Sequence, residues 1–193
     1  MTDATILAVL GIMIALLSLS VSATTMYFAW LRRGHLAMTK PTLVFFGHDM
    51  VPRPIPKIFL RTLLYSTSPQ GKMVESMYAK LIRGGTAQVF GFWGYGPTKE
   101  LTAGGGLFVG QTGVSANHHF VLSVHHPGYE FITGDYTIQV FARQTGRSDA
   151  ILLSEIRLTL DQAHAKALTE QAGVMFELEP DTQTYLGHAK ERP

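Results

Sequence analysis

The chain contains no cysteine among its 193 residues. Disulfides, thiolate nucleophiles, iron–sulfur clusters and cysteine zinc sites are therefore excluded. A protein without thiols is compatible with either side of a membrane, so cysteine usage assigns no compartment.

Charge is also scarce, and its distribution is uneven. Charged residues make up 16% of the chain, below the usual ~25%, and none occurs between Thr5 and Leu31. Of the sixteen Lys and Arg residues, three (Arg32, Arg33 and Lys40) follow that stretch, and of the fourteen acidic residues one (Asp3) precedes it. The rest of the chain carries thirteen of each sign. Nucleic-acid binding needs a clustered basic surface, so the sequence predicts no nucleic-acid partner.

The motifs of several enzyme classes are missing. Gly104–Gly106, Gly110 and Gly113 suggest a phosphate-binding loop, but Gly-Lys-Ser/Thr does not follow, and Val109 occupies the third glycine position of the dinucleotide fingerprint. A Gly-x-Ser-x-Gly nucleophile elbow is absent. A pair of carboxylates for glycoside hydrolysis stays open. The sequence predicts no cofactor.

The clearest feature present is the uncharged apolar run from Ile6 to Trp30. As a helix it would be about 37 Å long, enough to cross a hydrocarbon core of ~30 Å. Tyr27 and Trp30 stand where an interfacial aromatic belt would place them. We therefore predict a transmembrane anchor over residues 6–31, with the lipid bilayer as its partner.

Two alternatives to an anchor are a buried core helix and a cleaved signal peptide. Val21-Ser22-Ala23 resembles a cleavage site. However, residues 1–5 carry Asp3 and no Lys or Arg, and the apolar run continues past Ala23 to Trp30. Both features disfavour a signal peptide, so an uncleaved signal-anchor is the interpretation adopted.

The flanking charges predict the orientation of this single-pass anchor. Arg32, Arg33 and Lys40 follow the helix, and positive residues are retained on the cytoplasmic side. The N-terminus should lie outside and the C-terminal domain in the cytoplasm.

Beyond the anchor, alternation replaces the continuous apolar run. After a five-residue tail (1–5) and the anchor (6–31), residues 32–56 form a basic juxtamembrane segment with a short strand at 42–46 and a Pro-rich connector at 51–56. A β domain is expected over 57–187, followed by a frayed tail, 188–193. The expected strands are 57–66, 75–83, 86–95, 107–109, 117–124, 134–144, 151–160 and 174–179.

Local signals refine these elements. Gly84-Gly85 predicts a tight hairpin turn. Asp161 predicts an N-cap for a helix over 162–172, with Gly173 as the residue after its end. In 151–160, Leu152 shares a face with Ile156, Leu158 and Leu160, which predicts one buried face. Short strands with one short helix near the C-terminus predict an all-β, two-sheet β-sandwich.

The stretch Gly134-Asp135-Tyr136-Thr137-Ile138 resembles the tyrosine corner of immunoglobulin-like sandwiches. That resemblance implies that Tyr136 is buried and bonds to the backbone a few residues upstream. The expected fold is therefore an immunoglobulin-like β-sandwich, with a small β-barrel as the alternative.

Histidines are the candidate metal ligands. His118, His119, His125 and His126 cluster in the sequence, and His48 could join them. On a single strand, the two same-face pairs would lie roughly 20 and 26 Å apart, too far to share one ion. The alternative is that these histidines lie at strand ends, partly exposed and hydrogen-bonded.

Trp93 and Tyr95 alternate with Phe90 and Phe92 and are flanked by glycines, which suggests either a partner surface or a second buried face. With the catalytic motifs missing, the predicted function is a non-enzymatic, membrane-anchored interaction module with a protein partner. A metal- or histidine-dependent enzyme and an accessory subunit of an envelope complex are the alternatives.

Overall fold

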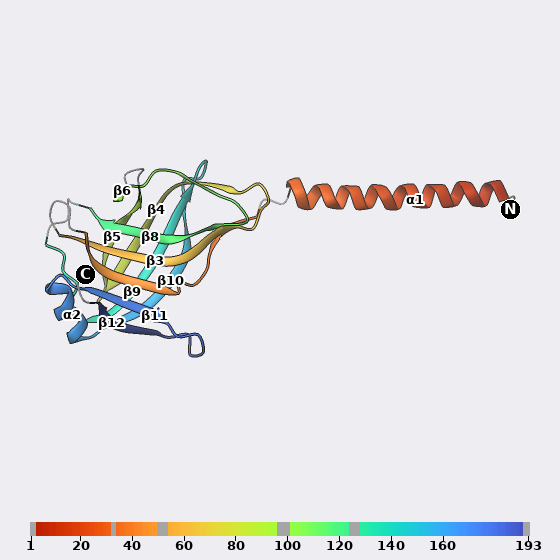
Figure 1. The fold of residues 1–193 in the computed structure, drawn as a ribbon. Helices are drawn as coiled ribbons and strands as arrows, with labels where there is room; N and C mark the ends of the chain where they lie inside the picture. The colour runs from red at the N-terminus through yellow and green to blue at the C-terminus, as the bar shows by residue number, and fades with distance from the viewer. Residues whose placement is uncertain (1–2, 32–33, 50–53, 96–100, 124–127, 191–193) are drawn as a thin grey trace.

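A computed structural model describes residues 3–31, 34–49, 54–95, 101–123 and 128–190. An N-terminal helix, α1 (Asp3–Met26), continues as one π-helical turn, η1 (Tyr27–Leu31), and projects away from a β domain (Figure 1). The mostly β class and the N-terminal apolar helix predicted from the sequence are both present.

No residue of α1 is buried, although the helix is almost entirely apolar. The segment Asp3–Ala29 is long and apolar enough to cross a membrane. Some of its hydroxyls are satisfied within the helix, because Ser20 Oγ donates to the Leu16 carbonyl oxygen (2.9 Å) and Thr24 Oγ1 to that of Ser20 (2.8 Å). A core helix is therefore wrong for this segment, since nothing in the described chain covers it.

The domain itself consists of strands and one short helix. In chain order they are β1 (Leu36–Met38), β2 (Leu43–Asp49), β3 (Ile55–Ser66), β4 (Lys72–Arg83), β5 (Thr86–Tyr95), β6 (Leu101–Ala103), β7 (Leu107–Val109), β8 (Val114–Leu122), β9 (Gly134–Gln144), β10 (Ala150–Leu160), α2 (Gln162–Thr169), β11 (Gly173–Leu178) and β12 (Tyr185–Lys190).

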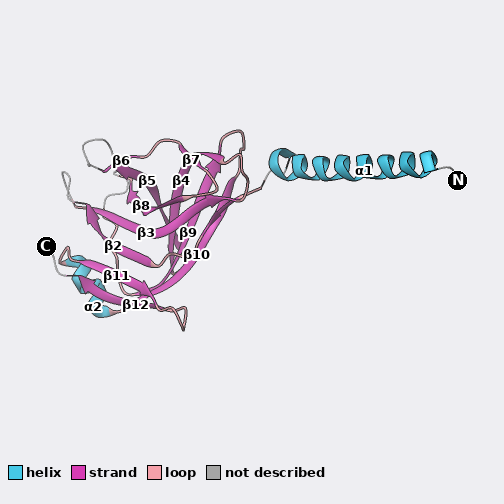
Figure 2. Cartoon of the chain, turned by 45° about the vertical axis from the view of Figure 1, so that its right-hand side comes forward, coloured by secondary structure: helices cyan, strands magenta, loops and turns pink. Residues whose placement is uncertain are grey.

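All the strand pairs are antiparallel and belong to one sheet, with the order β10-β9-β4-β5-β8-β3-β2-β11-β12. Three short strands add to this path: β1 pairs with β3, β6 with β5 and β7 with β4. The sheet curls strongly, so that its two ends approach each other (Figure 2). The prediction of two separate packed sheets is not confirmed.

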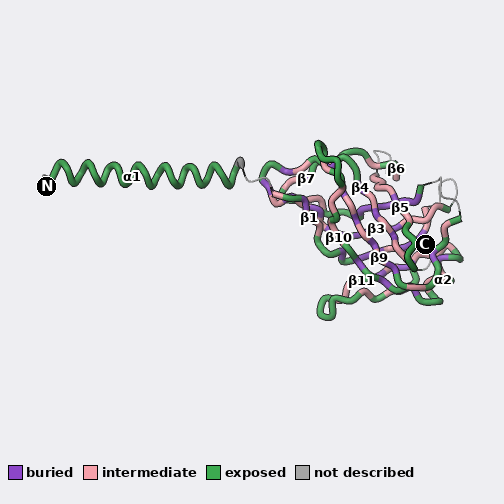
Figure 3. Tube along the Cα trace, turned by 180° about the vertical axis from the view of Figure 1, so that it is seen from behind, coloured by how far each residue is buried: buried purple, intermediate pink, exposed green. Residues whose placement is uncertain are grey.

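The core fills the inside of the curl (Figure 3). Alternate residues of the long strands face inward, as the period of two requires. The largest fully buried side chains are Tyr136, Phe46, Phe90, Phe120, Phe176, Ile58, Leu60, Leu64, Leu81, Ile138, Leu160 and Leu168.

The hairpin predicted around Gly84-Gly85 is present. Arg83 pairs with Thr86, and both glycines have positive φ (+54° and +82°), which a two-residue turn of this kind demands. The Pro-rich connector is only partly right, because β3 already begins at Ile55 and Pro56 pairs with His48. The rest of that connector, 51–53, lies outside the described residues.

The face predicted for strand 151–160 is wrong at its start. A bulge between Leu152 and Ser154 shifts the register against β9. Leu152 is therefore 51% exposed, while Leu153 packs against the core together with Ile151. From Ile156 onward the predicted buried face holds.

The C-terminal part also departs from the predicted boundaries. Asp161 is the N-cap of α2 as expected, but the helix ends at Thr169, and the residue with left-handed φ is Gln171 (+62°) rather than Gly173. Gly173 instead starts β11, where any side chain would collide with the ring of Phe45. β12 runs to Lys190, into the segment predicted as a frayed tail.

Tyr136 is 1% exposed, and its hydroxyl donates to the carbonyl oxygen of Ile132 (2.7 Å). The backbone N–H of Ile132 donates back to the same hydroxyl (3.0 Å). This side chain therefore fixes the chain four residues upstream of itself, at the entry to β9.

Candidate functional site: the open seam of the sheet

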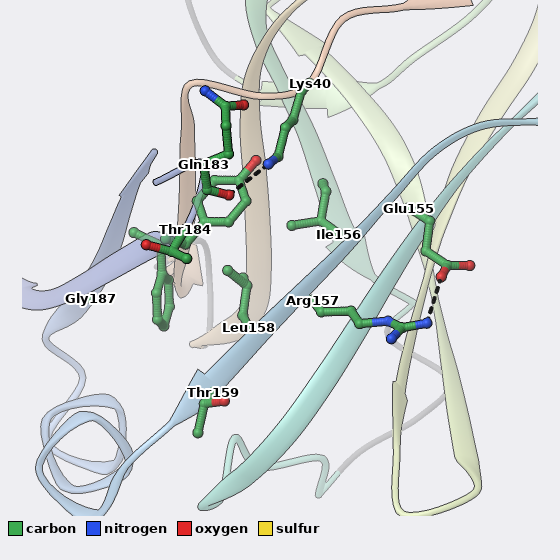
Figure 4. Close-up of a pocket in the computed structure, with 11 residues that line it drawn as sticks. Lys40, Glu155, Ile156, Arg157, Leu158, Thr159, Gln183, Thr184 and Gly187 are labelled. Carbon is green, nitrogen blue, oxygen red and sulfur yellow. Dashed lines mark hydrogen bonds and ion pairs between the residues drawn. The ribbon is translucent and has the colours of Figure 1, made fainter. Parts of the chain in front are cut away.

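A pocket of about 480 Å³ lies between β10 and the β11–β12 hairpin (Figure 4). β10 and β12 are the two ends of the sheet order, so within the described chain each has a strand partner on one side only, β9 and β11 respectively. The pocket is the gap left where the curled sheet does not close, and we call it the seam. Its lining residues are Lys40, Glu155, Ile156, Arg157, Leu158, Thr159, Phe176, Gln183, Thr184, Tyr185 and Gly187.

The β10 wall of the seam is a strand edge. Five consecutive residues, from Glu155 to Thr159, line the pocket. Successive side chains of a strand point to opposite faces, so five in a row can line one pocket only if the edge of the strand faces it. In an antiparallel pair, alternate residues direct their N–H and C=O groups away from the partner strand. The seam is therefore bordered by backbone donors and acceptors of β10.

The two faces of β10 differ in chemistry. Ile156 and Leu158 point toward the wall that carries Lys40 and Thr184 (Figure 4), and they are only 2% and 5% exposed. Glu155 and Arg157 project from the opposite face, where they form an ion pair of 3.6 Å. The Arg157 side chain is 83% exposed, so the pair adds little stability. The edge thus has an apolar inner side and a charged outer side.

The opposite wall is held in place by hydrogen bonds from Tyr185 and Lys40. The Tyr185 hydroxyl donates to the Pro41 carbonyl oxygen (2.7 Å), and burial raises the pKa of Tyr185 to about 12. Lys40 Nζ donates to the Gln183 carbonyl oxygen (2.7 Å) and lies 5.5 Å from the centre of the Tyr185 ring. Lys40 was predicted as a topology-determining charge, and in the fold it also braces the seam.

Gly187 allows this wall to pack tightly. A Cβ at Gly187 would lie 2.7 Å from ring atoms of both His164 and Phe176. The two rings, 5.6 Å apart between centroids, therefore rest directly on β12. His164 itself belongs to the capping box of α2, since its N–H donates to Asp161 Oδ1 (2.7 Å). Helix α2 thereby holds β11 and β12 on their side of the seam.

The predicted partner residue Trp93 lies in an aromatic row on the outer face of the sheet. The strand register places Met175 beside Phe45, Phe45 beside Phe59, Phe59 beside His119 and His119 beside Trp93. The rings of Phe45 and Phe59 stack at 4.7 Å, and Phe59 lies 5.2 Å from His119. Trp93 is thus packed in a row across β5, β8, β3, β2 and β11. The side chain of Tyr95, the other predicted partner residue, lies outside the described residues.

The three candidate histidines that the structure describes, His48, His118 and His119, belong to no group that could hold a metal ion. His118 and His119 lie within β8 and are 2% and 4% exposed, so their predicted placement at partly exposed strand ends is wrong. Their rings lie on opposite faces: His118 contacts Phe92 in the core, and His119 contacts Phe59 outside. His48 contacts Phe131, 5.9 Å away between ring centroids.

Burial sets the chemistry of these imidazoles. Desolvation lowers the pKa of His48 and of His118, and it lowers that of His119 to about 4, helped by the nearby Lys57 cation. Burial therefore favours the neutral form of all three imidazoles. Among the residues that the structure describes, no group of three or more His, Cys, Asp and Glu side chains could hold a metal ion. His125, His126, Arg32 and Arg33 lie outside the described residues.

The seam was missed at the sequence level because it joins residues that are far apart in the chain. Lys40, Glu155, Phe176 and Tyr185 carry no shared motif, and only the curl of the sheet brings their strands together. The one local signal was the polar outer pattern of residues 155–159, which is typical of any half-exposed strand.

Comparison of the chain with protein-family models, curated proteins and solved structures found no match.

Proposed function

We propose that the protein is a membrane-anchored interaction module whose seam binds an extended segment of a partner protein. The observation that carries this proposal is the free edge of β10, which lines a pocket through the five residues Glu155–Thr159. Addition of a strand to a sheet edge is a common mode of peptide recognition, in which backbone hydrogen bonds give affinity and alternate side chains give specificity.

The size and walls of the seam support this mode of binding. A pocket of about 480 Å³ falls within the ~300–1,000 Å³ that is usual for ligand sites. A strand laid along β10 would turn every second side chain toward Ile156, Leu158 and Phe176, so those side chains should be apolar. The alternate side chains of the bound strand would face solvent beside Glu155 and Arg157. Charge pairing across the two strands then favours a basic residue opposite Glu155 and an acidic residue opposite Arg157.

The same charges should protect the edge of β10 from indiscriminate pairing. Exposed edge strands tend to aggregate unless charges or bulges interrupt them. β10 has both, with Glu155 and Arg157 on its outer side and the bulge at Leu152–Ser154. A partner with matched charges is accepted, and a generic apolar strand is disfavoured.

Membrane anchoring through α1 is the second part of the proposal. Its support is the length and apolar composition of Asp3–Ala29 and the complete exposure of its side chains within the chain. We propose an uncleaved signal-anchor with the N-terminus outside and the domain cytoplasmic, based on Arg32, Arg33 and Lys40. The immunoglobulin-like relationship stays a prediction, supported by the Tyr136–Ile132 hydrogen bonds.

Site-specific photocrosslinking in cells tests the seam. A photoreactive amino acid is introduced into the full chain at Glu155 or Arg157, and at Val89 as the control. Val89 is 46% exposed. It lies in the same row of cross-strand partners as Glu155, because Glu155 pairs with Gln139, Gln139 with Lys80 and Lys80 with Val89. Val89 therefore lies on the same face of the sheet as Glu155 but on an interior strand, β5, rather than on the edge strand β10.

The proposal expects a discrete adduct from the two seam positions and none from Val89. Mass spectrometry of the adduct should map both crosslinks to one extended segment of one partner, two residues apart. Adducts of equal yield at Val89, or crosslinks scattered over unrelated proteins, would contradict binding at the seam.

A further inference from the structure

Two exposed apolar side chains stand together near the point where the domain joins α1. Phe108 in β7 is 60% exposed and Met73 in β4 is 53% exposed. The two residues are direct cross-strand partners. Isolated exposed apolar residues need no explanation, but an adjacent pair at a defined place in the fold invites one.

The hydrogen bonds of His35 fix how close the domain lies to the end of α1 and η1. His35 follows Leu31, the last residue of η1, by four positions, so at most about 14 Å of chain separates them. The backbone N–H of His35 donates to Thr67 Oγ1 (2.8 Å), and the backbone N–H of Thr67 donates to the His35 carbonyl oxygen (2.9 Å). These two hydrogen bonds hold the turn between β3 and β4, through Thr67, beside His35, four residues after the end of η1.

The apolar pair sits directly on this turn. The ring of Phe108 lies against Gly71, where a Cβ would be only 2.5 Å from Phe108 Cζ. Gly71 also has a φ of +68°, a backbone conformation that favours glycine. The backbone N–H of Ser66 donates to the Gly110 carbonyl oxygen (3.0 Å), which ties β7 to the end of β3. Figure 3 shows β7 at the end of the domain nearest α1.

We propose that Met73 and Phe108, whose ring covers the buried Gly71, form a membrane-proximal patch that inserts into the interface of the bilayer that α1 crosses. The inference rests on the proposed anchoring, because α1 is what holds the patch beside the lipid. A tethered surface meets its neighbour at high effective concentration, so a small apolar patch is enough for contact. Interfacial segments bury apolar side chains about 5–10 Å into the headgroup region.

The charges around the patch fit a lipid interface rather than a dry protein contact. Lys72 precedes Met73, and the backbone N–H of Thr145 donates to the Met73 carbonyl oxygen (3.1 Å), which brings the β9–β10 turn alongside. Arg143 and Arg147 are exposed there, as are Glu75 and Asp149. Charges of both signs around an apolar centre match zwitterionic headgroups. Contact at the patch would also fix the direction in which the seam faces.

The absence of cysteine makes a direct test possible. Single cysteines are introduced into the full chain at Phe108, at Met73, at Leu16 in α1 and at Ile132, and each is labelled with an environment-sensitive fluorophore. Ile132 is 43% exposed. The carbonyl oxygen of the next residue, Thr133, accepts a hydrogen bond from Arg83, the last residue of β4. Arg83 and Lys72 are the two ends of β4 and lie about 36 Å apart along the strand, so Ile132 is far from the patch. It is the matched control. The labelled chains are reconstituted in phosphatidylcholine vesicles, with quenching by headgroup spin-labelled lipid as the readout.

The proposal expects quenching at Phe108 and Met73 to be several-fold stronger than at Ile132. Equal, weak quenching at all three domain positions, with Leu16 in contact with lipid, would overturn the patch and leave the anchor standing. A Leu16 label that stays in water would instead overturn the anchoring itself. Using two patch positions guards against a local effect of either substitution.

Discussion

Tyr136 is the residue on which the entry to β9 depends. Tyr136→Phe removes both hydrogen bonds with Ile132 and should lower the free energy of unfolding by about 1–3 kcal/mol, since each bond contributes about 0.5–1.5 kcal/mol. Tyr136→Ala also leaves a cavity among Phe46 and its neighbours, and should cost about 3–5 kcal/mol. Thr137→Ser, on the opposite face, is the control and should change little.

Urea melts would measure these three variants on a fragment that begins at Gly34. That fragment keeps Leu36, which is 4% exposed and part of the core, whereas a cut at Lys40 would remove β1. Equal, negligible effects at Tyr136 and Thr137 would show that the assignment of the strand faces is wrong.

His119 should make the fold sensitive to acid. Its pKa is lowered to about 4 in the folded state by burial, against an ordinary value of 6.5. The unfolded chain therefore binds more protons between pH 6.5 and 4, so stability is fully present above pH 6.5 and is lost as the pH falls. Between pH 7 and pH 5 this group alone should remove about 2 kcal/mol. The lowered pKa values of His48 and His118 act in the same direction.

The measurement is the urea midpoint at pH 7 and pH 5 for the wild type and for His119→Gln. The variant should lose less stability on acidification than the wild type, whatever its stability at pH 7. His188→Gln, at an exposed position of β12, is the control. An identical acid loss in the wild type and in His119→Gln would rule out His119 as the source.

At the scale of elements, α2 is the piece whose capping supports the seam. Asp161→Ala removes the bond from the His164 N–H and should destabilise the domain by about 0.5–2 kcal/mol. Asp161→Asn keeps a side-chain acceptor and should stay close to the wild type. Urea melts followed by circular dichroism would compare the two variants. Equal losses for Ala and Asn would show that the carboxylate matters for another reason.

The elements themselves were largely predictable from local chemistry. Gly84-Gly85 specified its hairpin because both positions need positive φ, and Asp161 specified the start of α2 through its side-chain acceptor. Local chemistry could not show which face is buried before the bulge at Leu152–Ser154, because Ile151, Leu152 and Leu153 are all apolar. The end of α2 was also misplaced, since Gln171 took the left-handed conformation and Gly173 was needed under Phe45.

The buried histidines and the seam were beyond local patterns for a different reason. Whether His118 and His119 are covered depends on strands β3 and β5, which lie far from β8 in the sequence. The seam depends on how far the whole sheet curls. Both are properties of the complete strand order, which alternation within single strands does not encode.

At the scale of the whole molecule, the orientation of the domain is a prediction that a reporter can check. A reporter that is active only in the cytoplasm should work when fused after Pro193. Replacing Arg32 and Arg33 by Glu should weaken that activity, because positive residues beside the helix oppose translocation. Activity of a reporter that works only outside the cytoplasm, at the same position, would reverse the orientation.

The anchored state of the intact chain is the central claim, and one measurement tests it most directly: the intact mass of the protein recovered from carbonate-washed membranes. Alkaline carbonate strips proteins that are merely adsorbed and leaves integral ones in the pellet. The account predicts the full-length chain, 21.2 kDa, in the pellet. Recovery of the chain in the supernatant, or of a species lacking the residues up to Ala23, would contradict it.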